Sequence, residues 1–458
     1  MKTLDDIRIK FESPMWAMSP EFAVIDTILE ERPDLIELVK LDVLKGVKNN
    51  KMGRKDGPSV EQIVRAGIYK EIRRLTYSEL EFHQYDSSIC RTFLHLDKCF
   101  SSSVLQGYIS KINSASLKSI MVEINMIACG LGYEDFKDIR TDSTAVEADV
   151  QRPTNNSLVY DCIKTTAIFF EKIKEKYADK YNVVEAKRVE AKKINFGLNN
   201  VTGAKNDTQS AKEVKAEKMK ELFTEYLKIH QEIHQQVKAL IASGMDDFKE
   251  NQQKRIIKLE GNMSIVYNNA YKFQIEGKQV ETSEKIFSIY EDHTDIIVKG
   301  LRDIIFGHKV NLSTGRSNLI LYCNIEEGNP SDTSLFQEPI DTIKEDYGVK
   351  KFRGIATDGG FASLKNLLSA AKDFTNVVFT KVVGSLQNIV ENVEIETEMK
   401  KWRAGIEGNI SNLKRGFKLT RVTWKGKEMF DAKIFWSVIG YNIRVLTSHI
   451  LTTLQAGQ

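Results

Sequence analysis

The spacing of apolar residues predicts that roughly the first 130 residues are helical. In residues 19–31 and 60–82, apolar side chains recur every three or four positions, the period of a helix with one buried face. Pro58 and Ser59 followed by Glu61 and Gln62 form a pattern typical of a helix start. Just before it, residues 44–58 hold five cations and one acid. This stretch indicates either a solvated loop or an arm that contacts DNA phosphates in front of a helical DNA-binding unit.

The pattern changes at residues 136–150, where polar and β-branched residues alternate. This alternation predicts a strand with Asp142 near its middle, followed by a turn at residues 153–157. Residues 158–275 return to helical spacing, and we expect two or three long antiparallel helices with a loop at residues 194–207. His230 and His234 have a spacing that can bind metal. Because no zinc motif accompanies them, we interpret them as histidines on a helix surface.

From about residue 280 the strand pattern resumes, with strands expected within 285–300, 307–314 and 318–325. A helix near 338–348 precedes a strand that ends at Asp358, and a helix, a strand and long helices follow. The order predicts a mixed α/β sheet interrupted by a helical insertion. We therefore divide the chain into an N-terminal helical domain, the first part of a catalytic core, a helical insertion and the remainder of the core, at residues 1–130, 131–157, 158–275 and 276–458.

The composition says more about the cellular location of the protein than about its function. The 458 residues suffice for two or three domains, and a net charge of +3 means that any affinity for nucleic acid must come from local patches. Five cysteines without zinc or CxxC spacing fit a reducing, intracellular setting. The N-terminus lacks the apolar core of a signal peptide, and Asn442, Arg444 and His449 interrupt the most apolar late stretch. We expect a cytoplasmic protein with no membrane partner.

Three acids stand out by their placement. Asp142 lies on a strand, and Asp358 ends another strand before two glycines, where open sheets bind ligands. On a helix over residues 403–414, Arg403, Glu407 and Lys414 lie within about 40° of one another. An acid between two cations suits a magnesium ion with bound DNA phosphates, and two such ions about 4 Å apart can catalyse phosphodiester chemistry. Alternatively, Arg403 and Glu407 form a surface ion pair. Gly405 and Gly408 weaken this helix, or allow close approach of DNA.

Taken together, these motifs resemble bacterial insertion-sequence transposases of the DDE type, which have a ribonuclease-H-like catalytic core. Their signature reads Tyr, two residues, Arg, three residues, Glu, six residues, Lys. Arg403, Glu407 and Lys414 match three of its members, whereas Lys400 takes the place of the tyrosine. The first acid resembles Asp142 in TDSTAVE, and the second resembles Asp358 in IATDGG.

The resemblance implies a mechanism, cofactors and partners. Two Mg²⁺ ions, for which Mn²⁺ is an expected substitute, would be bridged by Asp142, with Asp358 and Glu407 each completing one site. Metal-activated water would cut transposon ends, and the exposed 3′-hydroxyl would attack target DNA. The double-stranded DNA of the terminal inverted repeats and of the target would be gripped by cations, and the protein would act as a homodimer in the synaptic complex, associated with the bacterial nucleoid. The expected DNA contacts are Arg403, Lys414, Arg415, Lys418 and Arg421, extended by Lys425 and Lys427.

Three other functions remain open: a ribonuclease-H-like nuclease without strand transfer, a catalytically inactive transposase-derived DNA-binding protein, and a helical scaffold. For several residues near the motifs we expect structural roles. Asn329 and Asp332 are expected to form a turn and a helix cap. Packing, surface or strand-fixing roles are expected for Ser143, Thr144, Glu147, His293, His308, Lys309, Trp402 and Trp424.

Overall fold

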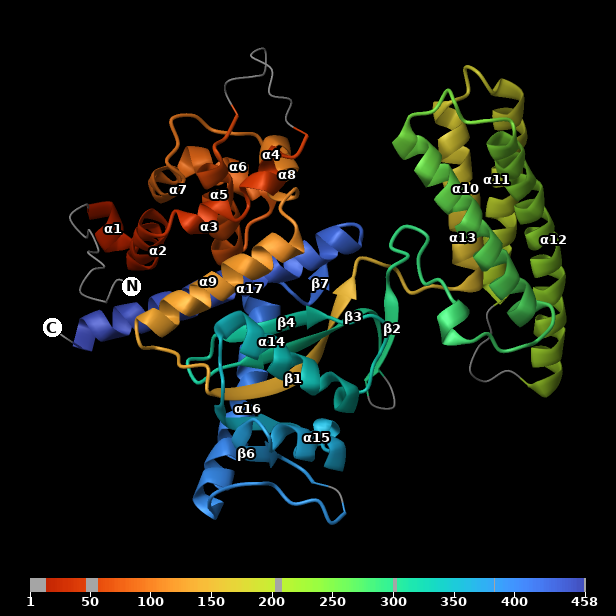
Figure 1. Ribbon diagram of the computed structural model, residues 1–458. Coiled ribbons are helices and arrows are strands. Elements are labelled where there is room, and N and C mark those ends of the chain that lie inside the picture. Colours follow the sequence, from red (N-terminus) through yellow and green to blue (C-terminus); the bar gives the residue numbers. More distant parts are fainter. Residues whose placement is uncertain (1–13, 47–56, 202–207, 300–302, 383, 457–458) are drawn as a thin grey trace. The chain divides into compact units, whose positions relative to one another are not determined.

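The computed structural model describes residues 14–46, 57–201, 208–299, 303–382 and 384–456 (Figure 1). Contacts divide the chain into two units. The sheet unit comprises residues 1–149 and 297–458, and the insertion unit comprises residues 150–296. The insertion unit is thus wider than the expected 158–275, and the N-terminal helices belong to the sheet unit. Most of the cation-rich stretch at residues 44–58 lies outside the described residues.

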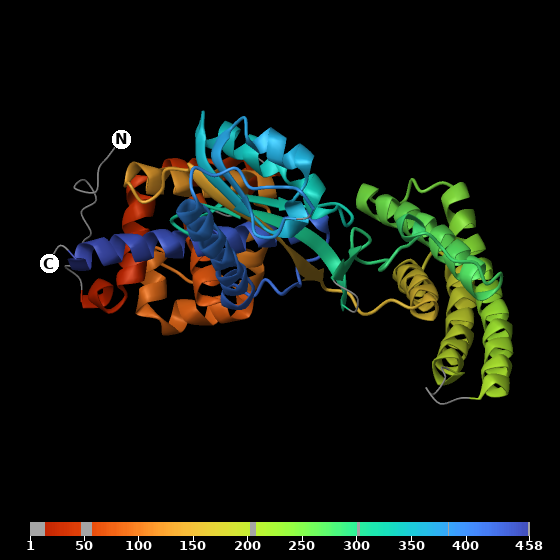
Figure 2. The same cartoon turned by 90° about the horizontal axis from the view of Figure 1, so that it is seen from below.

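Helices make up the described part of the first 130 residues. They are α1 (Pro14–Met18), α2 (Pro20–Glu31), α3 (Asp34–Glu37), α4 (Lys40–Leu44), α5 (Val60–Arg73), α6 (Tyr77–Asp86), α7 (Ser88–Phe93), α8 (Ser102–Ile109) and α9 (Ser114–Gly130). The predicted start at Ser59 is confirmed, because Ser59 and Gln62 form a reciprocal capping box. The C-terminal helix α17 (Lys427–Ala456) packs against α2, α5 and α9 (Figure 2). The ring of Trp436 lies where a side chain at Gly67 would stand, so the two ends of the chain share one core.

The sheet is mixed and has seven strands. Its main path runs β2 (Asp295–Lys299), β3 (Asp303–Thr314), β1 (Asp138–Ala148), β5 (Phe352–Thr357) and β6 (Phe374–Phe379), with β4 (Ile320–Ile325) on β3 and β7 (Arg421–Val422) on β1. β1 is antiparallel to β3 and parallel to β5, which is parallel to β6. Being central, β1 is buried along most of its length, and Asp142 and Ser143 are among its few partly exposed residues.

Helices follow the strands in the predicted order. α14 (Gln337–Tyr347) lies between β4 and β5, α15 (Leu364–Ala370) lies between β5 and β6, and α16 (Val393–Gly416) follows β6. α16 packs on β1, β5 and β6. The predicted mixed α/β sheet with an inserted helical segment is therefore confirmed, and α16 begins ten residues before the expected position 403.

The described part of the insertion unit contains four α-helices, not two or three: α10 (Asn155–Lys172), α11 (Ala178–Val201), α12 (Gln209–Ala242) and α13 (Glu250–Gln274). They enclose a hydrophobic core of their own. Two predictions are wrong here. Residues 155–157 start α10, with Thr154 as its cap, instead of forming a turn. Residues 194–201 are helical because Ile194 and Leu198 are buried in this core, which outweighs the loop signal of the surrounding Gly and Asn residues.

The prediction that His230 and His234 are surface residues is also wrong. His230 is completely buried, and neither ring nitrogen has a hydrogen-bond partner. Burial, together with repulsion from His234, lowers the pKa of His230 to about 3. Nε2 of His234 instead lies 2.8 Å from the Glu260 carboxylate. The two rings thus have different partners, and His230 packs as an uncharged aromatic against Tyr267.

No helix within the described ranges is long and apolar enough to cross a membrane. The late apolar stretch predicted as a buried helix forms most of α17, and its residues from Ile434 to Ile443 are all buried.

We expect His230→Leu to make the insertion unit less sensitive to acid. The pKa of His230 falls from about 6.5 in the unfolded chain to about 3 in the folded one. As the pH drops through this range, the free energy of unfolding decreases by at most ~1.4 kcal/mol per pH unit, because only the unfolded chain binds the proton. Urea unfolding of a 150–296 fragment, followed by circular dichroism, measures this slope. Between pH 7 and 8 the variant and the wild-type fragment should show the same slope. An unchanged slope below pH 6 would contradict the neutral buried state.

Candidate active site

The candidate site lies on the face of β1 that α16 covers. Side chains alternate along a strand, so Asp138, Arg140 and Asp142 point to one face. All three contact residues of α16 or residues that themselves contact it. Arg403 donates to Asp142, the backbone carbonyl of Trp402 accepts from Arg140, and Arg316 joins Asp138 to Glu398.

Arg403 connects two of the three predicted acids. Its Nη2 lies 2.7 Å from Oδ2 of Asp142, and its Nη1 lies 3.2 Å from Oε1 of Glu407. The side chain of Arg403 is 9% exposed, whereas that of Glu407 is 69% exposed. The ion pair between Arg403 and Glu407 is therefore not a simple surface pair, since the arginine is anchored in the interior by Asp142.

Asp358 lies beside Asp142 because of the register of the parallel strands. Thr141 of β1 pairs with Thr357 of β5, so the next residues, Asp142 and Asp358, are neighbours across the two strands. The Thr380 hydroxyl donates to Oδ1 of Asp358 at 2.9 Å. The fold thus brings Asp142, Asp358 and Glu407 to one region from two strands and one helix.

The pKa values of the two aspartates shift in opposite directions. Burial raises the pKa of Asp142, and the charges of Asp358 and Asp332 add to this rise, although Arg403 opposes it. Burial also pushes the pKa of Asp358 upward, but the Gly359 backbone N–H, the Thr380 hydroxyl and Arg403 outweigh it and lower the pKa. Asp358 therefore stays ionised more readily than its neighbour.

The donor set suits a hard divalent cation, because three carboxylates from separate elements can each offer oxygen ligands to Mg²⁺. The three carboxylates do not form a compact cluster of ligand atoms. Among the described residues, the group whose ligand atoms all lie within 4.8 Å of one another is Asp26, Glu30 and His95, away from this site. Asp26 there is already paired with Arg65. An ion bound by Asp142 and Glu407 together would replace contacts now made by Arg403.

Arg140 is a key residue that sequence reasoning missed. Its buried guanidinium donates to the Thr314 hydroxyl, the Trp402 carbonyl and the Asn318 side chain. Burial lowers its pKa to about 10. A Cβ at Gly405 would lie 2.5 Å from Nη1 of Arg140. Gly405 therefore makes room for this guanidinium, which corrects the idea that it allows DNA to approach, whereas a Cβ at Gly408 would meet no atom within 4 Å.

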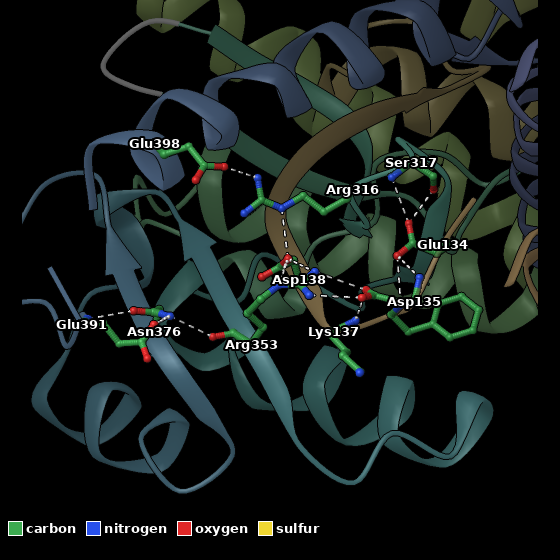
Figure 3. A network of polar contacts seen from close by, with 11 residues as sticks. Glu134, Asp135, Lys137, Asp138, Arg316, Ser317, Arg353, Asn376, Glu391 and Glu398 are labelled. Carbon is green, nitrogen blue, oxygen red and sulfur yellow. Dashed lines mark hydrogen bonds and ion pairs between the residues drawn. The ribbon is translucent and has the colours of Figure 1, made fainter. Parts of the chain in front are cut away.

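A second polar network fixes the start of β1 (Figure 3). Asp138 is 1% exposed and accepts from Arg316 at 3.1 Å and from Arg353 of β5 at 2.6 Å. Arg316 also reaches Glu398 of α16 at 2.7 Å and lies over the Trp402 ring. The same Asp138 thus links β1, β5 and, through Arg316, the helix that carries Glu407. The signal for this network was present as charged residues at every second position of a strand, Asp138, Arg140 and Asp142.

Asp332 is a fourth acid near the site, and its predicted role as a helix cap is wrong. The cap of this short helix is Ser331, and Asp332 instead accepts from the Ser143 hydroxyl at 2.9 Å and from Lys309 at 3.2 Å. A Cβ at Gly360 would lie 3.0 Å from the Asp332 carboxylate, and one at Gly359 would collide with Lys381. These two glycines therefore let the Asp358 loop pack closely against protein atoms.

The predicted DNA contacts comprise buried Arg403 and a set of cations that follow Glu407 in the chain. Arg403 is buried and faces the carboxylates, so its surroundings do not favour a direct contact with a DNA phosphate. Lys414 and Arg415 lie in the last turn of α16, Arg415 being exposed. Lys418 is exposed in a left-handed turn at φ 54°, and Arg421 on β7 pairs with Glu147. Arg421 pairs with Glu147 near the far end of β1, about 16 Å along the strand from Asp142.

The other residues for which structural roles were expected make contacts within the protein. Nδ1 of His308 lies 3.2 Å from the Glu326 carbonyl, and His293 pairs with Glu291. The Trp402 ring lies against Arg140 and Arg316, and Trp424 stacks on Tyr77.

Gly405→Ala and Gly408→Ala form a matched pair that tests whether Arg140 needs the space left by the missing side chain at position 405. Both changes should gain about 1 kcal/mol of helix propensity. Only the first forces a methyl group against a guanidinium that its hydrogen bonds hold in place, so Gly405→Ala should be less stable than Gly408→Ala by about 1–3 kcal/mol. Chemical denaturation of both variants checks this. Equal stabilities would mean that Arg140 moves without cost.

Comparisons with known proteins add no relative. No family model, no curated protein and no solved structure matches this chain. The carboxylate site, and the strand register and helix that bring it together, are the features from which a function can be argued.

Proposed function

We propose that this chain is a DNA transposase of the DDE type, which cleaves transposon ends and joins the 3′-hydroxyl to target DNA. The observation that carries the proposal is the convergence of Asp142, Asp358 and Glu407, linked in part by Arg403. Three acids far apart in sequence come together in one region although their like charges repel. A shared polyvalent ligand supplies a reason.

The order of elements supports a ribonuclease-H-like core. A strand with the first acid is followed by antiparallel β3 and β4, then by α14, by parallel β5 with the second acid, by α15 and β6, and by α16 with the third acid. This is the order expected for such a core, with the helical insertion between its first two strands.

Asp142, Asp358 and Glu407 would hold Mg²⁺ ions, which when bound activate the attacking oxygen and stabilise the leaving one. The chain's own groups prepare the site for this cation. Arg403 opposes the rise in the pKa of Asp142 and so favours its ionised form, and Thr380 and the Gly359 N–H favour the ionised form of Asp358. Exposed cations after Glu407, notably Arg415 and Lys418, would hold DNA phosphates farther along the strand from the cleaved bond. Action as a homodimer on DNA in the cytoplasm belongs to the same proposal.

One observation favours a second candidate, an inactive transposase-derived DNA-binding protein. Arg403 already compensates the charge of Asp142 and also pairs with Glu407, so the acids are partly satisfied by the protein itself. In that case the acids would be a structural ion-pair cluster. A nuclease that cuts without strand transfer would share the carboxylates and differ only in its products.

We expect Asp142→Asn and Glu407→Gln each to reduce cleavage of a duplex carrying the element's own ends by more than about 100-fold, because even residues behind metal ligands cost 10- to 100-fold. DNA binding in EDTA should stay within about threefold, since phosphate contacts dominate affinity. Labelled products resolved on gels, with Mg²⁺ and with EDTA, give the measurement.

Glu394→Gln is the matched control for these variants, because Glu394 is an exposed acid in the first turn of the same helix. It should cleave like the wild type. Binding without metal-dependent cleavage by the wild type would favour the inactive descendant. Cleavage without joined products would favour the nuclease.

A further inference from the structure

A second site is visible in the sheet unit, apart from the carboxylates. It is a cavity of about 570 Å³ between the N-terminal helices and the segment from Lys418 to Lys433. We call it the basic pocket, and its cations are Lys70, Lys418, Arg421, Lys425 and Lys433. No acid is among the described residues that line it.

The charges around the basic pocket do not balance. At its base, Lys70 and Lys433 share one carboxylate, that of Glu71, at 3.0 and 2.6 Å. All three groups are buried, so one excess positive charge is held away from water. Burial and the nearby Lys70 lower the pKa of Lys433, although Glu71 opposes this. An anion in the pocket would relieve this electrostatic cost, since buried charges are normally paired.

The rim adds further cations. Lys418 and Lys425 are exposed, and among the described residues neither lies within ion-pair distance of a carboxylate. Arg421 pairs with Glu147 on one side. The charge of Glu79 also acts on Lys418. The five cations that line the pocket still outnumber the acids Glu71, Glu79 and Glu147 that these contacts bring to them.

The wall supplies an aromatic surface. The rings of Tyr77 and Trp424 stack with centroids 6.0 Å apart, and Lys70 lies over both. A nucleotide base can stack on an aromatic surface of this kind. The cavity is also larger than one phosphate group needs, so its occupant carries more than the anion.

We propose that the basic pocket binds a phosphate ester of nucleotide size, with the phosphate on Lys418 and Lys425 and the organic part against Tyr77 and Trp424. The same chemistry is offered by a free nucleotide and by a nucleotide within a nucleic-acid strand. The site does not depend on the strand chemistry proposed for the carboxylates. Its location on α5, α6, α8 and the start of α17 makes it a joint product of both ends of the chain.

The test uses the full chain in EDTA and isothermal titration calorimetry with four probes: inorganic phosphate, a deoxynucleoside monophosphate, a short single-stranded oligonucleotide and its duplex. The double variant Lys418→Glu with Lys425→Glu should weaken binding by at least about tenfold, because charge-assisted contacts become repulsive. Trp424→Ala keeps every charge and removes part of the stacking surface, so it should weaken binding of the monophosphate about tenfold and leave binding of inorganic phosphate within about twofold.

Lys350→Glu with Lys372→Glu is the matched control, because both lysines are exposed and lie outside the pocket. It makes the same change in net charge and should leave affinity within about twofold, since screening weakens distant charges. Binding of the monophosphate that competes with the oligonucleotide identifies a nucleotide site, and binding of the oligonucleotide alone identifies a strand path. Absence of binding to every probe, or an equal loss in the control, overturns the proposal. Cleavage is read separately, so loss of one site leaves the other testable.

Discussion

The geometry of the candidate site depends on one buried guanidinium. Arg140 projects from the central strand into a space that exists because residue 405 of α16 has no side chain, and it bonds the Trp402 carbonyl of that helix. Its other bonds, to Thr314 and Asn318, reach β3 and the turn that follows it. A buried charge that is fully engaged in this way has few alternative positions. The position of α16, and with it of Arg403 and Glu407, is set relative to the strand that carries Asp142.

Electrostatics then decide what the site can hold. Three arginines, at positions 140, 316 and 403, lie along one helix–strand contact, and each meets a different set of acceptors. Arg403 serves Asp142 and Glu407 together, which keeps the cluster stable without a metal. A cation bound by both acids would compete with Arg403 for the same carboxylate oxygens.

The basic pocket differs from the carboxylate site in its balance of charge. Around the carboxylate site the acids are balanced by arginines, whereas in the pocket the cations exceed the acids. Arg421 joins the two regions, since it lines the pocket and pairs with Glu147 on the strand that carries Asp142. An anionic strand that crosses both regions would meet cations first and carboxylates second. The insertion unit, with its own core and its buried neutral His230, is organised separately.

The sequence by itself determined the order of helices and strands, the insertion, and the positions of Asp142 and Asp358, because apolar periodicity and strand-end acids are local signals. It did not reveal that residues 194–201 are helical or that His230 is buried, since both follow from packing against distant helices. The roles of Arg140, Asp332 and Gly405 were decided by tertiary structure alone. Each acts through a partner more than 150 residues away, and no local pattern encodes which side chains meet across a sheet or which charge a neighbour will neutralise.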